Sequence, residues 1–379
     1  MAKKALLIGI NYPGTAVELR GCVNDVRRMQ KCLIERYGFS NKDITILIDT
    51  DKSCIQPTGK NIRHHLEKLI DLGKSGDFLV FHYSGHGTRL PPPDIESGDS
   101  TGFDECITPC DMNLIRDDEF RSMVANVKKG CQLTIISDSC HSGGLIEGVK
   151  EQIGESHVKP IEEDHADPPK PGIVNNLLSI LTSFFAICGI SKSQTQTQTD
   201  RGGGQESFAG ELELETDETF DVKTRYIPFH IYVSLLKQQT GKTNIQSGRI
   251  RQTLAKLFGE DSSMSRDRSL RDIGNCEVNA AVDSERPILK TKVFADKGIL
   301  LSGCQTNEKS EDVYVTRTGK AYGAFSDAIQ TILSETRKDK KITNKKLVMR
   351  AREILKRHRF SQRPGLYCHD RYVNKPFIC

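Results

Sequence analysis

Several common functional signatures are absent from this chain of 379 residues, and each absence narrows its function. Neither the GxxxxGKS/T phosphate loop nor a GxGxxG run between a strand and a helix is present, and Gly202–Gly204 lie in a polar, low-complexity stretch. We therefore expect no nucleotide site and no organic cofactor. The formal net charge of +4 is small for this length, so charge alone does not indicate a nucleic acid partner.

The cysteines lack the dense, regular spacing of a disulfide framework, although there are twelve of them. The opening MAKKALLIGI places two lysines before an apolar run, as a signal peptide does. That run is short and leads into Asn11, Tyr12 and Pro13, where a cleavage site would need small residues. We interpret the run as a strand and expect a cytoplasmic protein, in which a free thiol can serve as a nucleophile.

One apolar stretch, 173–190, approaches the length of a membrane span. Asn175, Asn176, Ser179 and Thr182 interrupt it, which favours an amphipathic helix or a segment that docks on a partner. We expect no stable membrane insertion, and contact with a membrane surface stays open.

Residues 1–155 alternate short apolar runs with helical patterns, which predicts an α/β fold with a mainly parallel sheet covered on both faces. In the segment from Asn24 to Tyr37, for example, Val26, Met29 and Leu33 share one helical face. The predicted strands are Lys4–Ile10, Ile44–Asp49, Phe78–Tyr83 and Leu133–Ser137, and the predicted helices are Asn24–Tyr37, Thr58–Leu72 and Asp117–Val127.

Residues 156–225 have the composition of a flexible, cleavable linker. His157–Pro171 is rich in proline and charge, Ser191–Gly204 is low in complexity, and Gly202–Val222 carries seven acidic residues and no Lys or Arg. Such segments do not bury enough apolar surface to form a core. The first basic residue after the acidic tract is Lys223.

Residues 226–379 return to the pattern of a folded region. Helices are predicted at Ile227–Gln239, Tyr322–Leu333 and Thr343–Lys356, and a buried strand at Gly298–Ser302. Arg337–Arg363 holds twelve Lys and Arg residues against two acids. We interpret that excess as a solvated helix face, with attraction to nucleic acid or an acidic partner as the alternative.

Two glycine-rich segments carry reactive side chains directly after predicted strands. Residues 81–87 read FHYSGHG and contain His86, and residues 136–144 read ISDSCHSGG and contain Cys140. The carboxyl ends of parallel strands meet at one edge of a sheet, where ligands bind. Adjacent strands would therefore bring His86 and Cys140 together across 54 positions of sequence.

This pair suits nucleophilic catalysis. A free thiol has a pKa of about 8.5, so a nearby imidazole is needed to take its proton during attack and to return it to the leaving amine. The backbone N–H groups of Gly87 and Cys140 are candidates for stabilising the oxyanion that forms on the attacked carbonyl. The alternatives are a buried structural thiol and a structural histidine. Zinc bound by Cys106, Cys110, His82 and His86 is a further alternative, but the two cysteines lack a second matching pair.

The motifs HYSGHG and DSCHSGG resemble those of the metacaspases, within the caspase-type cysteine proteases. The opening KKALLIGINYPGTAVELRGCVND strengthens the resemblance, and the linker and the closing QRPGLYCHDRYVNKPFIC are similar to plant type II members. The resemblance implies a caspase-like three-layer fold. In that fold, residues 1–155 form a large, p20-like region and 226–379 a small, p10-like region of one catalytic domain. It also implies His86 as base and Cys140 as nucleophile.

The resemblance further implies cleavage after Lys or Arg. The matching S1 positions are Asp25 and Asp138, with Cys22 and Ser84 at lesser positions of the same pocket. Two carboxylates at the base of a pocket favour a basic side chain and disfavour an acidic one. The alternative for each aspartate is a role at the start of a helix.

Type II members resemble zymogens that need calcium and cut themselves in the linker. Calcium binds six to eight oxygens, and the loop 94–105 offers acids at irregular spacing for a weak site. These acids are Asp94, Glu96, Asp99, Asp104 and Glu105. Lys223 is the first candidate for self-cleavage, because it follows the acidic tract directly, and Arg225 is the second.

The resemblance therefore implies a calcium-dependent cysteine endopeptidase that acts on protein substrates, and we expect it to be a monomer. The resemblance alone links it to programmed cell death and stress. Two other functions stay open. The chain could be a protease-like scaffold that recruits partners, or a transferase that passes the same thioester to an acceptor other than water.

Overall fold

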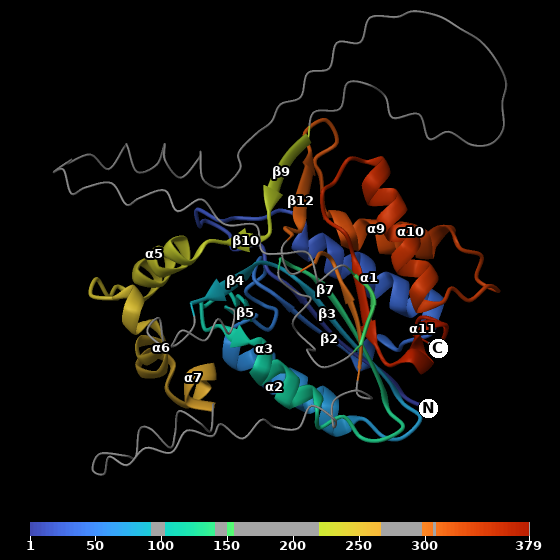
Figure 1. The fold of residues 1–379 in the computed structure, drawn as a ribbon, viewed down its shortest axis with the longest axis horizontal. Helices are drawn as coiled ribbons and strands as arrows, with labels where there is room; N and C mark the ends of the chain where they lie inside the picture. The colour runs from blue at the N-terminus through green and yellow to red at the C-terminus, as the bar shows by residue number, and fades with distance from the viewer. Residues whose placement is uncertain (92–102, 141–149, 155–219, 267–297, 306–307, 379) are drawn as a thin grey trace, which may run out of the picture.

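The computed structural model describes residues 1–91, 103–140, 150–154, 220–266, 298–305 and 308–378 (Figure 1). Its central layer is a seven-stranded sheet of order β2-β1-β3-β7-β11-β14-β8. The strands from β2 to β11 in this order are parallel, and β14 is antiparallel to both of its neighbours. The strands are β1 Lys3–Gly9, β2 Ile44–Ile48, β3 Phe78–Ser84, β7 Gln132–Asp138, β8 Glu151–Ile153, β11 Ile299–Ser302 and β14 Gly365–Cys368.

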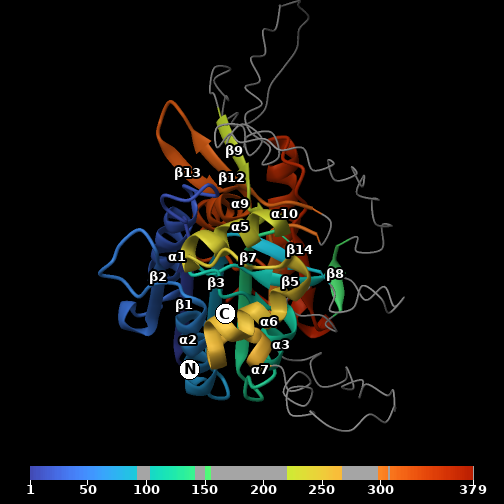
Figure 2. The same ribbon diagram turned by 90° about the vertical axis from the view of Figure 1, so that its left-hand side faces the viewer.

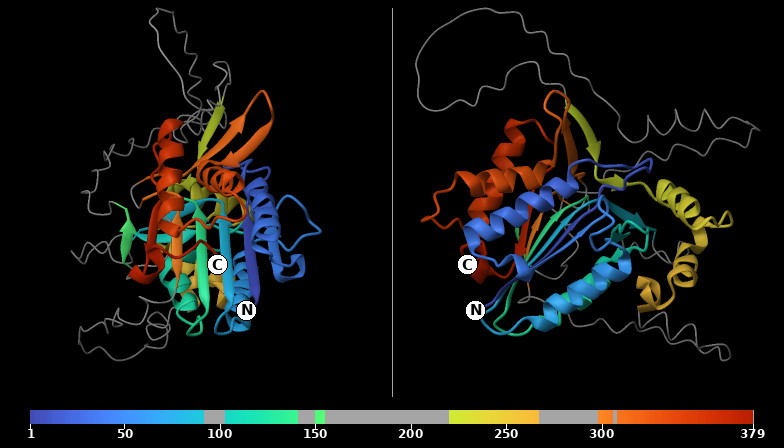
Figure 3. Two further views of the ribbon diagram at one scale, coloured as in Figure 1. Left: turned by 90° about the vertical axis from the view of Figure 1, so that its right-hand side faces the viewer. Right: turned by 180° about the vertical axis from the view of Figure 1, so that it is seen from behind.

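Helices cover both faces of this sheet, so the predicted α/β fold with a mainly parallel central sheet is confirmed (Figures 1 and 3). One face carries α1 Cys22–Tyr37, α9 Ala324–Glu335 and α10 Asn344–Arg357, and the other carries α2 Gly59–Leu72 and α3 Asp117–Val124. Val26, Met29 and Leu33 of α1 are fully buried, as their helical spacing predicts.

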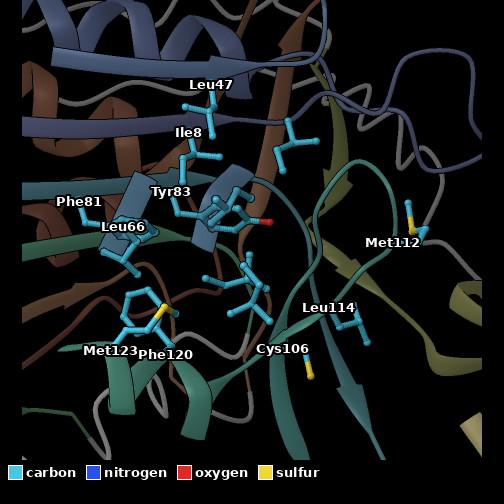
Figure 4. Packing of buried hydrophobic residues seen from close by; sticks show 14 of the residues in the cluster. Ile8, Leu47, Leu66, Phe81, Tyr83, Cys106, Met112, Leu114, Phe120 and Met123 are labelled. Carbon is cyan, nitrogen blue, oxygen red and sulfur yellow. The ribbon is translucent and has the colours of Figure 1, made fainter. Parts of the chain in front are cut away.

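The inner strands are apolar on both faces because both faces are covered. In β1, Leu6 and Ile8 pack towards α2 and α3, whereas Ala5 and Leu7 pack towards α1 and α9. Figure 4 shows the first of these cores, in which Ile8 lies near Phe81 and Tyr83 of β3 and near side chains of α2 and α3. The continuous apolar runs seen in the sequence are thus the strands of the buried sheet.

Two small sheets lie at the carboxyl edge of the central sheet, and neither was predicted. One has the order β10-β4-β5-β6 and the other the order β13-β12-β9. Their strands are β4 Gly87–Leu90, β5 Asp104–Ile107, β6 Ile115–Arg116, β9 Phe220–Thr224, β10 Tyr226–Ile227, β12 Glu311–Val315 and β13 Lys320–Gly323. Strands of two to five residues are too short to produce a clear alternating pattern.

Four further helices are described besides those that cover the two faces of the central sheet. Figure 2 looks onto α5, α6 and α7, which lie beside the sheet that contains β4 and β5. The bounds are α5 Phe229–Thr240, α6 Ile250–Phe258, α7 Ser263–Arg266 and α11 Asp370–Val373, with 3₁₀ turns at Asn41–Asp43, Ser247–Arg249 and Gly259–Asp261.

The predicted linker, 156–225, extends too far towards the C-terminus. Phe220–Thr224 forms β9, which pairs antiparallel with β12, and Arg225 is fully buried. The reason is a long-range one, because β9 gains its order by pairing with a strand about 90 residues later in the chain. The apolar stretch 173–190 lies outside the described residues. Among the helices that are described, none is long and apolar enough to cross a bilayer.

The regions on either side of the linker contribute to one sheet. β7, from the N-terminal region, pairs in parallel with β11, from the C-terminal region, over Thr134–Ser137 and Ile299–Ser302. β14 then pairs with β8, so the C-terminal strands lie between two N-terminal ones. The two regions therefore share the central sheet and fold as one unit.

A buried ion pair joins α2 to α3 in this core. Arg63 is fully buried, and its guanidinium donates to both carboxylate oxygens of Glu119 at 2.8 and 3.0 Å and to the Leu114 carbonyl at 2.6 Å. Glu119 also accepts from the Ser263 hydroxyl, which ties α7 to the same point. Removing one partner of such a pair leaves an uncompensated buried charge.

We expect Glu119→Gln to lower the free energy of unfolding by about 3 kcal/mol, because Arg63 would lose its counter-charge without gaining solvent. Urea unfolding followed by circular dichroism measures the change. Glu67→Gln is the matched control, since its partner Arg266 is partly exposed and the loss should stay below about 1 kcal/mol. Equal effects of the two substitutions would contradict a dominant role for the buried pair.

Candidate active site

The structure places His86 and Cys140 at equivalent points beyond two adjacent strands. β3 pairs in parallel with β7, with Ser84 opposite Asp138, and each reactive residue follows its strand end by two positions. The backbones then meet, since a Cβ atom on Gly87 would lie 2.2 Å from the Cys140 carbonyl oxygen. Only glycine permits this approach. In the part of the chain that the structure describes, the thiol and imidazole do not hydrogen-bond each other directly.

The orientation of His86 comes from a backbone carbonyl that the sequence did not point to. The ring Nε2 lies 2.7 Å from the Val17 carbonyl oxygen, which can only accept, so Nε2 carries the proton. Nδ1 is buried without a hydrogen-bond partner and keeps its lone pair. The Tyr12 hydroxyl accepts from the His86 backbone N–H at 3.0 Å and fixes the base of the side chain. The ring is therefore set up to receive a proton at Nδ1.

Cys140 is buried within a small polar cage. Its sulfur accepts from the Ser310 N–H at 3.0 Å and lies 3.7 Å from both the Ser310 carbonyl oxygen and the Thr224 hydroxyl. Burial raises the pKa of the Cys140 thiol to about 12 and lowers the pKa of the His86 imidazole to about 4. In this arrangement both groups are neutral at pH 7.

Arg225 fills a closed acidic pocket beside the thiol. Its side chain is fully buried, and Nη2 donates to Asp25 Oδ2 and to Asp312 Oδ1, both at 2.9 Å. Nη1 donates to the Ser84 hydroxyl at 2.8 Å and lies 3.2 Å from Asp138 Oδ2. One guanidinium is thus held by three carboxylates and a hydroxyl, which is a recognition site for a basic side chain.

The carboxylates of the pocket are themselves held in place by backbone N–H groups. Asp25 accepts from Gly323 at 3.0 Å, Asp138 from Ser326 at 2.8 Å, and Asp312 from Arg20 and Gly21 at 2.9 and 3.1 Å. Burial raises the pKa of Asp25, and the guanidinium opposes that rise. The pocket is therefore preorganised, and its bound cation favours the ionised form of Asp25.

The predicted pocket residues all lie here, and one further residue was missed. Asp25, Asp138 and Ser84 contact Arg225 directly. Cys22 is buried nearby, where the charge of Arg225 opposes the rise that burial causes in the pKa of its thiol. The alternative for Asp138, an N-cap of the helix that follows it in the chain, stays a prediction, because residues 141–149 lie outside the described residues. Its carboxylate accepts from the Ser326 N–H, in the first turn of α9. Asp312 was missed, since nothing in the run EDVYV distinguishes it from an acid at a strand edge.

The backbone of Arg225 is hydrogen-bonded through both its carbonyl oxygen and its N–H. Its carbonyl oxygen accepts from the Gly87 N–H at 2.9 Å and lies 3.5 Å from the Cys140 nitrogen, and these are the two predicted oxyanion donors. Its own N–H donates to the Ser310 carbonyl at 2.8 Å. The carbonyl carbon of Arg225 is thereby polarised beside the thiol.

The residues around Arg225 extend the chain through the site as two short strands. On the N-terminal side, β9 pairs antiparallel with β12, and Lys223 points out of the pocket to donate to the Glu18 carbonyl at 2.8 Å. On the C-terminal side, β10 pairs in parallel with β4, with Tyr226 opposite Gly87. Of the two candidates for self-cleavage, Arg225 has its side chain in the acidic pocket and its carbonyl on the Gly87 N–H, whereas Lys223 lies two residues earlier, in β9.

The described acids of the predicted calcium loop are bound by arginines. Asp104 lies 2.7 Å from Arg251 and 3.2 Å from Arg116, and Glu105 lies 3.4 Å from Arg89. Asp94, Glu96 and Asp99 lie outside the described residues. Within the described ranges, no group of three or more His, Cys, Asp or Glu side chains is placed to hold a metal ion. Asp104 and Glu105 therefore do not fit as calcium ligands in this arrangement.

Comparisons with known proteins agree with this geometry. Residues 3–148 match the family described as "Metacaspase, peptidase C14 domain". The chain is 70% identical to Metacaspase-8 of Arabidopsis thaliana over 387 aligned positions and 51% identical to Metacaspase-7 of the same plant, with the whole of both chains covered in each case.

More distant matches extend the likeness. Metacaspase-9 of Arabidopsis thaliana is 38% identical over 382 positions, covering 100% of this chain and 98% of that protein. Among solved structures, a protein of Geobacter sulfurreducens has a TM-score of 0.52 at 17% identity, covering 100% of this chain and 98% of that one, and this shows a shared fold alone. By its full-length identity to plant relatives and by its peptidase domain, this chain belongs to the metacaspase family and is a cysteine-type endopeptidase.

Proposed function

We propose that this endopeptidase cuts peptide bonds on the carboxyl side of Arg or Lys, with Cys140 as nucleophile and His86 as general base. The observation that carries the proposal is the placement of Arg225. Its side chain fills the acidic pocket while its carbonyl oxygen lies on the Gly87 and Cys140 N–H groups. A protein substrate would bind in the same way, with its basic residue before the cut.

In the proposed mechanism, Cys140 Sγ attacks the substrate carbonyl carbon as its proton passes to His86 Nδ1. The oxyanion is stabilised by the Gly87 and Cys140 N–H groups, each of which is worth about 3 kcal/mol in comparable sites. His86 then gives the proton to the leaving amine, and a thioester remains on Cys140. Water activated by His86 releases the acid product. The hydrogen bond from Nε2–H to Val17 keeps Nδ1 facing this exchange.

The geometry of the pocket favours Arg over Lys. A guanidinium contacts Asp25, Asp312 and Ser84 at once, in a planar fork that one ammonium group cannot reproduce. An acidic side chain would face three carboxylates and be repelled. Gly323 adds a steric limit, because a Cβ atom there would lie 2.4 Å from the Arg225 Nη1 atom.

In our proposal the chain is a zymogen whose own segment, 220–227, occupies the substrate site until it is cut between Arg225 and Tyr226. The neutral thiol and imidazole are consistent with a latent state. The requirement for calcium, a monomeric cytoplasmic form and a role in programmed cell death or stress are retained as parts of the proposal from the family resemblance. No catalytic step is assigned to calcium, since the described acids do not form its site.

A scaffold without catalysis is the less favoured alternative. Such a protein would not need a polarised carbonyl beside a thiol, or a buried cation that costs several kcal/mol to desolvate. Transfer of the thioester to another acceptor would use the same residues.

The first prediction concerns catalysis and specificity. Peptide reporters ending in Arg or in Asp are incubated with the parent chain and with Cys140→Ala, in millimolar calcium or in chelator. We expect calcium-dependent release from the Arg reporter only, reduced at least about 1,000-fold in Cys140→Ala. Release from the Asp reporter would contradict the pocket assignment, and release by Cys140→Ala would contradict the nucleophile.

The second prediction separates the two self-cleavage candidates. Arg225→Gly removes the cation from the pocket, so we expect self-cleavage to be lost there, whereas Lys223→Gly removes only the contact with Glu18 and should still be cut. Mass spectrometry of the fragments after calcium addition identifies the cut. A Lys223→Gly chain that stays intact while Arg225→Gly is cut normally would reverse the assignment.

The third prediction tests the carboxylate that the sequence did not indicate. Asp312→Asn keeps the size of the side chain but removes one negative charge from the pocket, together with one of the two oxygens that accept from Arg20 and Gly21. We expect kcat/KM for an Arg reporter to fall roughly 10- to 100-fold, in line with the loss of one charge-assisted hydrogen bond. Asp327→Asn, on the partly exposed side of α9, is the control and should change little.

A further inference from the structure

The amine side of the Arg225–Tyr226 bond is fixed to the body of the protein. Ile227 is fully buried, and its carbonyl oxygen accepts from the Thr88 hydroxyl at 2.7 Å. β10 pairs in parallel with β4, which places Tyr226 opposite Gly87 and Ile227 opposite Thr88. The nitrogen that leaves on cleavage therefore belongs to a residue held beside an oxyanion donor.

The next helix strengthens this anchor. α5 begins at Phe229, directly after Pro228, and its residues Ile231, Tyr232, Leu235 and Leu236 are buried in the core shared with α2 and α3. The fully buried Tyr232 donates its hydroxyl proton to the Met112 carbonyl at 2.8 Å. Tyr226 is thus joined through two residues to a packed helix. Cutting the chain does not by itself release it.

The acyl side of the bond is held equally firmly. Arg225 keeps its contacts with three carboxylates, and β9 keeps its pairing with β12 from Phe220 to Thr224. Cys140 and His86 are each about 2% exposed, so little water reaches the place where the thioester would form. After the C–N bond breaks, the thioester and the new amine therefore remain neighbours in a nearly dry site.

We infer that the thioester between Cys140 and Arg225 is resolved by attack of the Tyr226 amine in preference to water, so that this site re-forms peptide bonds as well as breaking them. The inference rests on the proposed function. Each cut of the chain's own segment would then be reversed within the site. Net cleavage would require that β10 leave β4, or that a nucleophile stronger than water enter the site.

The two directions balance without any outside reactant. In the forward direction, the Cys140 proton passes to His86, the C–S bond forms, the Arg225–Tyr226 C–N bond breaks, and His86 protonates the departing nitrogen. In the reverse direction, the Tyr226 nitrogen attacks the thioester carbon and gives a proton to His86. The C–N bond re-forms, the C–S bond breaks, and His86 returns the proton to sulfur. No atom or electron is gained or lost over the cycle.

General chemical principles favour attack on the thioester by the Tyr226 amine over attack by water. A well-oriented group in the same molecule reacts as if present at an effective molarity of about 10⁵ to 10⁸ M. That range lies far above the concentration of liquid water, and the burial of Cys140 lowers the supply of water further. The preference for the Tyr226 amine over water should fall as soon as the amine loses its position. The inference also predicts that free peptide amines can be joined to Arg acyl groups once the β4 edge is vacant.

The decisive experiment traps the thioester in the intact chain. Full-length protein in chelator is incubated with neutral hydroxylamine, which is a much stronger nucleophile towards thioesters than water and can therefore compete with the tethered amine. We expect the chain to persist without hydroxylamine. With it, we expect a cut that yields residues 1–225 ending in a hydroxamate, together with a fragment that begins at Tyr226, both identified by mass spectrometry. Cys140→Ala should give neither product.

Thr88→Val provides the matched test of the anchor. It keeps the size of the side chain and removes the hydrogen bond to Ile227. The freed segment should allow water to compete, so without hydroxylamine we expect the share of chains cut at Arg225 with a plain carboxylate to rise several-fold over the parent. An unchanged share, in a variant that still cuts an Arg reporter, would contradict retention of the amine by β10.

The remaining outcomes are distinguishable. If the chain cuts an Arg reporter in calcium but gives no hydroxamate, or gives only the carboxylate, the inference fails and the proposed function stands. If the chain cuts no reporter under either condition, the proposed function fails and the inference fails with it. A Cys140-dependent hydroxamate on Arg225, with the parent otherwise intact, supports both.

Discussion

The burial of one cation among three carboxylates is the interaction on which the rest of this site depends. A fully buried guanidinium costs several kcal/mol to remove from water, and only paired, well-oriented acids offset that cost. Asp25, Asp138 and Asp312 do so because backbone N–H groups hold each of them. Once the Arg225 side chain is fixed, its carbonyl must lie on Gly87 and Cys140, and the strands on both sides follow. Binding of the Arg225 guanidinium in the pocket thus also positions the Arg225 carbonyl at the Gly87 and Cys140 N–H groups.

The pocket also joins the two halves of the chain. Asp25 comes from α1 and Asp138 from β7, whereas Asp312 and the Ser310 groups come from the region after the linker. Since β7 and β11 are adjacent in one sheet, the pocket is complete only when both regions have folded together. A fragment that lacked β12 would keep Cys140 and His86 but lose the Asp312 carboxylate and the strand that pairs with β9.

Much of this could be predicted from local patterns, and the rest could not for identifiable reasons. The five parallel strands of the central sheet and the helices that cover it followed from apolar periodicity, whereas the short antiparallel strands β14 and β8 were missed. His86 and Cys140 followed from glycine-rich segments at strand ends. Asp312 and β9 depend on pairing between distant segments, which leaves no local trace. The partner of His86 is the Val17 carbonyl, and a backbone oxygen has no residue type to recognise. Asp104 and Glu105 suggested a metal site by composition, and their arginine partners are visible only in space.

The acidic pocket of this chain is filled by a side chain of the same chain, Arg225, and this limits which substitutions the pocket can accept. A change in the pocket is compatible with folding only if position 225 changes to match, because a mismatch leaves either a buried cation without partners or three acids without a cation. Substitutions in the pocket and at position 225 must therefore occur together, as they do on the two sides of an obligate interface. Position 225 therefore carries the kind of side chain that the acidic pocket of the same chain binds.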